Sequence, residues 1–108
     1  MTISILYVTF ANVDEAKSIC KILVRERLAA CCNILGDSTS IYIWDGKLCE
    51  DNEVAALVKT STELASKATA RIRDLHSYDT PCIIEICSGP SSNVDYVNWL
   101  HTFLCSNS

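Results

Sequence analysis

The chain contains 108 residues, carries a formal net charge of −4 at pH 7 and has 49% hydrophobic residues. This length and composition predict one globular domain spanning residues 1–108 and exclude an intrinsically disordered chain. The acidic balance disfavours nucleic acid as a partner, and no apolar run approaches the roughly 20 residues of a membrane span.

The cysteines and the start of the sequence bear on the cellular compartment. Seven cysteines are present, at positions 20, 31, 32, 49, 82, 87 and 105, and none forms a C-x-x-C pair. Most lie in apolar runs, where a thiol behaves as a small hydrophobe, so we expect buried, reduced thiols rather than a metal or redox set. No basic stretch with a cleavage site opens the sequence, so it predicts a cytoplasmic protein.

The first two elements follow from the spacing of apolar residues. Residues 3–10 form a near-continuous apolar run, which is typical of a central strand buried on both faces. Asn12 and Glu15 predict a capping box that starts a helix. The buried face of that helix shows the i, i+3, i+4 spacing and comprises Ala16, Ile19, Cys20, Leu23, Val24 and Leu28.

A long hairpin is predicted next. Residues 29–35 begin a second strand, residues 36–38 form a bend or bulge, and the β-branched and aromatic pattern resumes through Trp44. The Asp45-Gly46 pair indicates a tight turn, which needs positive φ, and a returning strand covers residues 53–59. Such a ribbon cannot bury both faces within so short a chain, so we expect another copy of the chain to cover it.

The second half of the chain predicts a helix, a strand and a further helix. Thr60 and Glu63 form a second capping-box pattern, and the helix that follows ends near His76. Residues 83–87 predict a fully buried strand, and Ser92 or Asn93 starts the last helix. The order β-α-β-β-α-β with an added helix predicts an α+β, ferredoxin-like sandwich with an antiparallel sheet. Right-handed crossovers place the first and third strands in its middle.

The fold class alone does not select a function. Residues 54–57 of the third strand are apolar and lack the stacking aromatics of an RNA-recognition domain. Residues 10–12 supply neither the arginine nor the glycine expected of a phosphate-binding loop. A nucleophile, base and orienter cannot be assembled around His76 and His101, the two histidines of the sequence. The sequence therefore predicts a protein that is not an enzyme.

Two groups of side chains could bind a metal. His76 lies at a helix end, where capping is the simpler role and metal ligation the alternative. His101 lies among apolar neighbours and is interpreted as structural. Four carboxylates cluster around the hairpin and either add solubility to a turn or bind a hard divalent ion weakly; they are Asp45, Glu50, Asp51 and Glu53.

Five sequence blocks, in order and with matching spacing, resemble the CutA divalent-cation-tolerance family. The blocks are residues 28–31, 40–47, 53–60, 76–81 and 96–100. The resemblance implies a homotrimer whose long hairpins wrap onto neighbouring subunits and a role in tolerance of copper and other divalent metals. It implies that a divalent ion such as copper or zinc, or a small effector, binds weakly in clefts between subunits. The family-typical residues near such clefts or interfaces are Tyr42, Trp44, Glu53, Lys59, His76, Tyr78 and Trp99.

The chain also departs from the family pattern. Members suspected of binding copper resemble it at His76 but carry an extra cysteine and a second histidine, where this chain has Val8 and Leu75. Proline and glutamate of the following loop are replaced by Ser77 and Cys82. Two soft-metal ligands are thus absent, which leaves His76 as the metal ligand that the resemblance supplies and Cys82 as the candidate substitute.

The function predicted from these features is a non-enzymatic homotrimer that binds a divalent cation weakly or takes a small anionic effector. In it, Lys59 is the cationic anchor, and His76 with neighbouring carboxylates contacts the metal. The alternative is a signalling or scaffolding trimer that acts through a protein partner, similar to the nitrogen-regulatory trimeric signal proteins.

Overall fold

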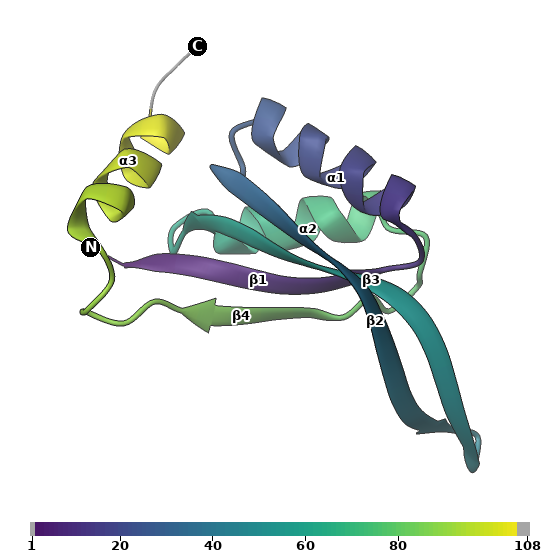
Figure 1. Cartoon of the computed structure of the whole chain (residues 1–108). Helices are drawn as coiled ribbons and strands as arrows, with labels where there is room; N and C mark the ends of the chain where they lie inside the picture. The colour runs from purple at the N-terminus through teal and green to yellow at the C-terminus, as the bar shows by residue number, and fades with distance from the viewer. Residues whose placement is uncertain (1, 106–108) are drawn as a thin grey trace.

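The computed structural model describes residues 2–105, and its strands form one antiparallel sheet in the order β2-β3-β1-β4. The element bounds are β1 Ile3–Phe10, α1 Val13–Arg25, β2 Cys31–Trp44, β3 Lys47–Ser61, α2 Ala65–Leu75, β4 Ile83–Cys87 and α3 Val94–Cys105. The predicted ferredoxin-like order, with the first and third strands in the middle, is confirmed (Figure 1).

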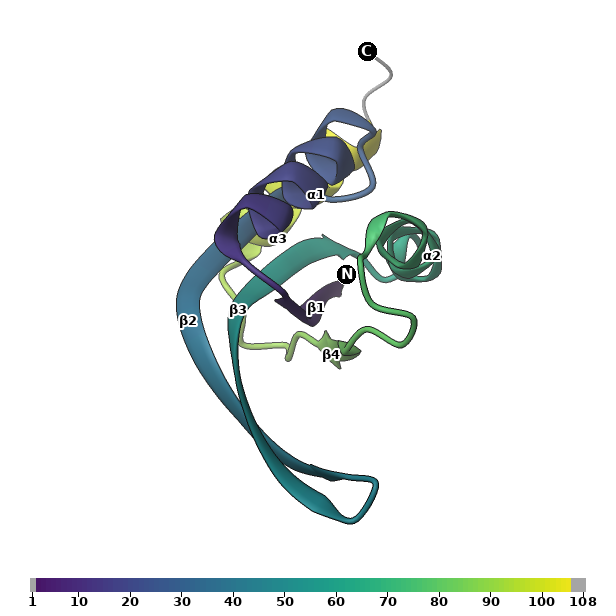
Figure 2. The ribbon, with the colours of Figure 1, turned by 90° about the vertical axis from the view of Figure 1, so that its right-hand side faces the viewer.

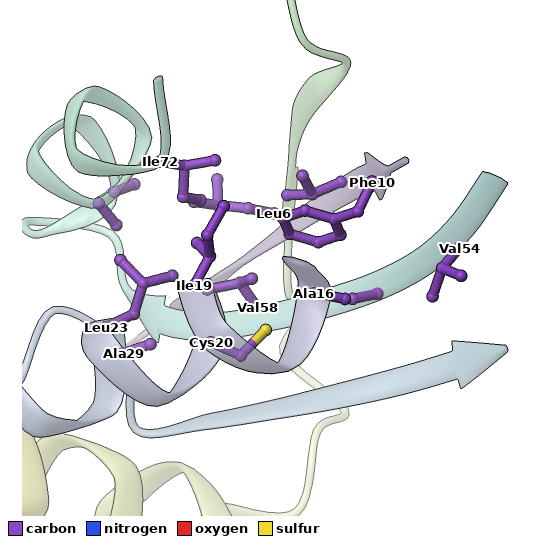
Figure 3. Packing of buried hydrophobic residues seen from close by; sticks show 14 residues of the cluster. Leu6, Phe10, Ala16, Ile19, Cys20, Leu23, Ala29, Val54, Val58 and Ile72 are labelled. Carbon is purple, nitrogen blue, oxygen red and sulfur yellow. The ribbon is translucent and has the colours of Figure 1, made fainter. Parts of the chain in front are cut away.

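The main core lies between one face of the sheet and the helices α1 and α2 (Figure 2). Successive strand residues point to opposite faces, so Leu6, Val8 and Phe10 all reach this layer from β1. They meet Leu23 of α1 and Ile72 of α2, and these side chains are almost fully buried (Figure 3). A second, smaller cluster holds α3 at the end of the sheet near the N-terminus; it contains Ile3, Ala30, Val97 and Leu100.

Helix starts show where local sequence signals were sufficient. The Asn12 side chain accepts a hydrogen bond from the Glu15 amide at 2.8 Å, which confirms the predicted cap of α1. The predicted capping box at Thr60 and Glu63 is wrong, because Thr60 continues β3 and donates its hydroxyl to the Leu28 carbonyl at 2.7 Å. Helix α2 instead begins at Ala65 without a side-chain cap.

The hairpin is longer than its sequence pattern indicated. The turn at Asp45 and Gly46 has positive φ at both residues, as a two-residue hairpin turn of this kind requires, and a bulge lies between Ile34 and Gly36, as expected. However, β3 begins at Lys47 rather than at residue 53. Residues 39–52 therefore project from the body as a paired two-stranded extension, which we call the arm (Figure 1).

Burial of β4 is the main error of the sequence prediction. The strand exists over the predicted residues, but Ile84 and Ile86 are 57% and 49% exposed. The reason is that β4 is an edge strand and α1 and α2 cover only the other face of the sheet. The expectation of buried thiols holds for Cys20 and is wrong for Cys82, Cys87 and Cys105, which are exposed.

No helix within residues 2–105 is long and apolar enough to cross a bilayer.

Candidate functional site: an acidic hollow at the root of the arm

A hollow of about 570 Å³ lies where the arm leaves the body. Its walls come from β1, from both strands of the arm and from the loop between α2 and β4. The lining residues are Thr9, Ser40, Tyr42, Trp44, Asp51, Glu53, Tyr78, Thr80 and Cys82. The lining contains two carboxylates and no basic side chain, so the hollow has a negative potential. We call it the acidic hollow.

Strand alternation assembles this lining. In the register of β2 and β3, Ser40 faces Asp51 and Tyr42 faces Cys49, so these residues share one side of the ribbon. Glu53 lies two residues beyond Asp51 on the same side. Glu50 pairs with Ile41 and points to the opposite side of the arm. Of the four carboxylates around the hairpin, the acidic hollow therefore includes two.

Hydroxyl groups surround both carboxylates of the hollow. The Ser40 hydroxyl donates to Glu53 at 2.6 Å, and the Tyr42 phenol donates to Asp51. That hydrogen bond to Asp51 raises the pKa of Tyr42 to about 12. Burial, together with a hydrogen bond to Glu53, raises the pKa of Tyr78. Both phenols are neutral near pH 7, as ordinary phenols are, and they serve the carboxylates as hydrogen-bond donors.

His76 lies behind this wall and is buried, with 9% of its surface exposed. Its Nε2 donates to the Thr9 carbonyl oxygen at 2.8 Å, and its Nδ1 accepts from the Tyr78 amide at 3.1 Å. Its ring also stacks on Phe10 at 5.2 Å between centroids and contacts the Tyr78 ring. Both ring nitrogens are thus engaged, and a metal could reach His76 only after one of these hydrogen bonds breaks.

The remaining cleft residues predicted from the family resemblance lie elsewhere on the chain. Lys59 contacts α3, where its Nζ is 3.3 Å from the Tyr96 hydroxyl and 5.1 Å from the centre of the Tyr96 ring. Trp99 packs against the rings of Tyr96 and Phe103. Within the chain, Tyr42, Trp44, Glu53 and Tyr78 are together, and Lys59 and Trp99 form a separate group at α3.

Several residues of the hollow were not singled out from the sequence, namely Thr9, Ser40 and Thr80. The period-two alternation of the arm could have identified Ser40, because it follows once the turn at Asp45 fixes the register. Thr9 and Thr80 come from distant segments and left no local signal. Cys82 lines the hollow, as its candidate role requires, but no group of three or more His, Cys, Asp or Glu side chains capable of holding a metal occurs within residues 2–105.

Comparison with known proteins identifies a single family. Residues 4–102 match the family described as "CutA1 divalent ion tolerance protein". The chain is 43% identical to the "Divalent-cation tolerance protein CutA" of Pyrococcus horikoshii and 41% identical to that of Thermus thermophilus, each over 89% of this chain and 92% of the relative. The crystal structure of the divalent ion tolerance protein CutA1 from Ehrlichia chaffeensis superposes with a TM-score of 0.90 at 35% identity, covering 96% of both chains.

Proposed function

The chain belongs to the CutA1 divalent ion tolerance family, and from this membership we propose that it is a homotrimer that binds a divalent cation weakly in clefts between subunits. Copper and zinc are the candidate ions. The observation that supports cation binding is the acidic hollow, in which Asp51 and Glu53 lie on one side of the β2–β3 hairpin with no basic residue in the lining.

The donor set explains why we propose weak binding. Carboxylate and hydroxyl oxygens suit hard or borderline divalent ions, and Cys82 adds one sulfur to the same hollow. Sites with few charged ligands on an exposed surface bind with dissociation constants on the order of 10⁻⁴ to 10⁻³ M. In this proposal His76 positions Tyr78 through its Nδ1, and it coordinates the metal only if it gives up one hydrogen bond.

The trimer is proposed from the apolar surface that one chain leaves exposed. The uncovered face of the sheet carries Ile84 and Ile86, and the arm carries Ile41, Ile43 and Leu48, which are 66 to 76% exposed. Burying one such side chain stabilises an interface by roughly 1.5–3 kcal/mol. A second and third copy of the chain would cover both surfaces.

The cation proposal is tested with Mn²⁺, an ion that prefers oxygen ligands over thiols. We expect paramagnetic broadening of NMR signals from the acidic hollow, and dissociation constants about tenfold higher in Asp51→Asn and in Glu53→Gln, since each loses one of two charged ligands. Glu50→Gln is the matched control, because it removes the same charge from the opposite side of the arm. Equal broadening in all variants, or none in the parent protein, would reject the proposal. In the second case the scaffolding alternative gains support.

The trimer is tested by multi-angle light scattering. We expect three chains per particle in the parent protein and dissociation in Ile86→Asp, which places a charge on the exposed sheet face. Ser66→Asp adds the same charge to an exposed position of α2 and is expected to stay trimeric. A parent protein that remains a folded monomer at micromolar concentration would contradict the assembly.

Two further features support the non-catalytic, cytoplasmic assignment that we propose. The hydrogen bonds of His76 and His101 all join backbone groups, namely those of Thr9, Tyr78 and Thr2, so neither ring is paired with a nucleophile. All seven cysteines are free thiols, a state that reducing compartments maintain. Cell fractionation with an antibody against the untagged protein checks the location.

A further inference from the structure

A second pocket, separate from the acidic hollow, lies between α1 and the edge strand β2. Its volume is about 400 Å³, within the range of about 300–1,000 Å³ that is typical of small-molecule sites. Its lining residues come from α1 and β2 alone, and none of them lines the acidic hollow. We call it the helix–strand pocket.

Four apolar side chains form what we call the floor of this pocket. Cys20 is buried in the main core (Figure 3), and Val24, Cys32 and Ile34 are half-buried and pack against the same core. Strand alternation places Cys32 and Ile34 on one face of β2. Because β2 is an edge strand, no further strand among residues 2–105 covers its outer side. An apolar group that enters the pocket would therefore leave water and contact the floor, which favours binding.

Three cations line the same pocket. Lys17, Lys21 and Arg25 are exposed and lie four residues apart on α1, so they form one row along the helix. No acidic side chain lines the pocket. Among residues 2–105 the structure records one salt bridge, between Arg71 and Glu26, so no carboxylate neutralises the row. The row holds three of the nine Lys and Arg residues of a chain with net charge −4, which makes the pocket a local positive field on an acidic molecule.

The floor and the row of cations together select a class of ligand. A purely apolar molecule would leave the cations unused, and a small hydrated anion would leave the floor unused. The row extends over two turns of α1, roughly 12 Å at the usual rise of an α-helix, so one anionic group can contact two neighbouring cations. Arg25 adds a guanidinium, which binds carboxylates through paired hydrogen bonds.

We propose that the helix–strand pocket binds a small amphipathic anion, an apolar chain or ring that ends in a carboxylate. The apolar part lies on the floor, and the carboxylate lies between Lys21 and one of its neighbours in the row, Lys17 or Arg25. Such a carboxylate is already ionised at pH 7. Binding is therefore reversible and needs no proton transfer, covalent bond or change in oxidation state.

This site differs from the acidic hollow in place and in the sign of its charge. The hollow has carboxylates in its lining and suits a cation, whereas the helix–strand pocket has cations in its lining and suits an anion. Mn²⁺ reports on the first and a carboxylate on the second, so one proposal can fail while the other stands.

The test is a titration of the isotope-labelled protein with octanoate, followed by NMR. We expect saturable shifts of the amide signals of the floor, namely those of Cys20, Val24, Cys32 and Ile34. Octanol has the same chain without the charge and should bind about tenfold more weakly, because it loses two ion pairs on an exposed rim. Acetate has the charge without the chain and should give no saturable shift. Equal affinity for octanoate and octanol, or saturable binding of acetate, would overturn the proposal.

Two variants separate the contributions of the floor and the row. Val24→Phe should fill the pocket and weaken octanoate binding at least tenfold. Lys21→Gln removes the central cation at an exposed position, so it should weaken octanoate about threefold and leave octanol unchanged. Lys67→Gln is the matched control, because it removes the same charge from an exposed position of α2 outside the pocket. Glutamine and lysine have similar helix propensities, and thermal unfolding confirms that each variant folds.

A second copy of the chain is the competing occupant of this pocket. Octanoate shifts that appear only in the dissociated Ile86→Asp variant would show that another chain covers the pocket in the assembled protein, and they would overturn the proposal. It is equally overturned if octanoate causes no saturable shift in either protein, or if Lys21→Gln and Lys67→Gln bind octanoate as the parent protein does.

Discussion

The two halves of the β2–β3 ribbon have the same backbone pairing and opposite surroundings. In the body, Val54, Ala56 and Val58 of β3 are buried beneath α1. In the arm, Ile41 and Ile43 of β2 are exposed, although the ladder resumes after the bulge at Ile34 and Gly36 and continues to Trp44 and Lys47. The difference teaches that β-propensity and turn chemistry suffice to pair two strands, whereas burial depends on what else lies against them.

The arm also differs from the body in how its two sides are used. One side carries the acidic hollow with Tyr42 and Asp51, and the other carries Ile41 and Ile43. A single strand register therefore separates a polar side, which lines the acidic hollow, from an apolar side, which is exposed in the single chain. A slip by one residue would exchange the two sides and destroy both features.

A charge introduced into the part of the β2–β3 hairpin that packs on the core should lower the stability of the fold more than any other change considered. Val58→Asp buries an unpaired carboxylate in the main core, where Val58 has no exposed surface, and such a charge costs at least about 3 kcal/mol. We expect a lower urea midpoint for unfolding or failure to fold. A midpoint within error of the parent protein would contradict the described core.

An aspartate introduced into the arm should weaken the association of chains and leave the fold of each chain intact. Ile43 is 71% exposed in the single chain, so Ile43→Asp should leave the circular dichroism spectrum unchanged. In the proposed trimer it removes roughly 2 kcal/mol of burial per chain, and light scattering should show dissociation upon dilution. Unaltered assembly would show that this side of the arm stays exposed to solvent.

Gly36 and Gly46, the two glycines of the β2–β3 hairpin with positive φ, allow the cost of backbone strain to be compared between the bulge and the arm tip. At neither position would an added β-carbon have another atom within 4 Å, so alanine would meet no steric obstacle and only the backbone conformation matters. Gly36 has φ of 109° at the bulge, and Gly46 has φ of 75° at the arm tip. Gly36→Ala should cost about 1–2 kcal/mol of unfolding free energy, as measured by urea titration. Gly46→Ala should cost about 1 kcal/mol or less, because a φ of 75° lies close to the left-handed region that residues with a β-carbon can adopt.

The smallest expected effect is a pH dependence of stability that is confined to the arm. The hydrogen bond to Asp51 raises the pKa of Tyr42 to about 12, above the value of about 10 in an unfolded chain. The contribution of this hydrogen bond to the stability of the arm is therefore complete below about pH 10 and is lost as the pH rises through about 12. Spectrophotometric titration of phenolate should show the midpoint of one tyrosine falling toward 10 in Asp51→Asn. A midpoint unchanged by that substitution would show that the hydrogen bond is not formed in solution.

Sequence patterns determined the elements of this protein and their order. The apolar run of residues 3–10, the Asn12 cap and the Asp45-Gly46 turn are local signals, and each produced the expected structure. The family resemblance added Tyr42, Trp44, Glu53 and Tyr78 to the candidate site, and the structure brings these four together. Local signals succeed here because backbone preferences act over a few residues.

Tertiary structure alone decided which surfaces are covered and which distant groups meet. It left Ile84 and Ile86 of β4 exposed, engaged both nitrogens of His76 and placed Lys59 against α3. These outcomes depend on how α1, α2 and α3 pack on the sheet, and packing between segments far apart in the chain has no short-range sequence signal.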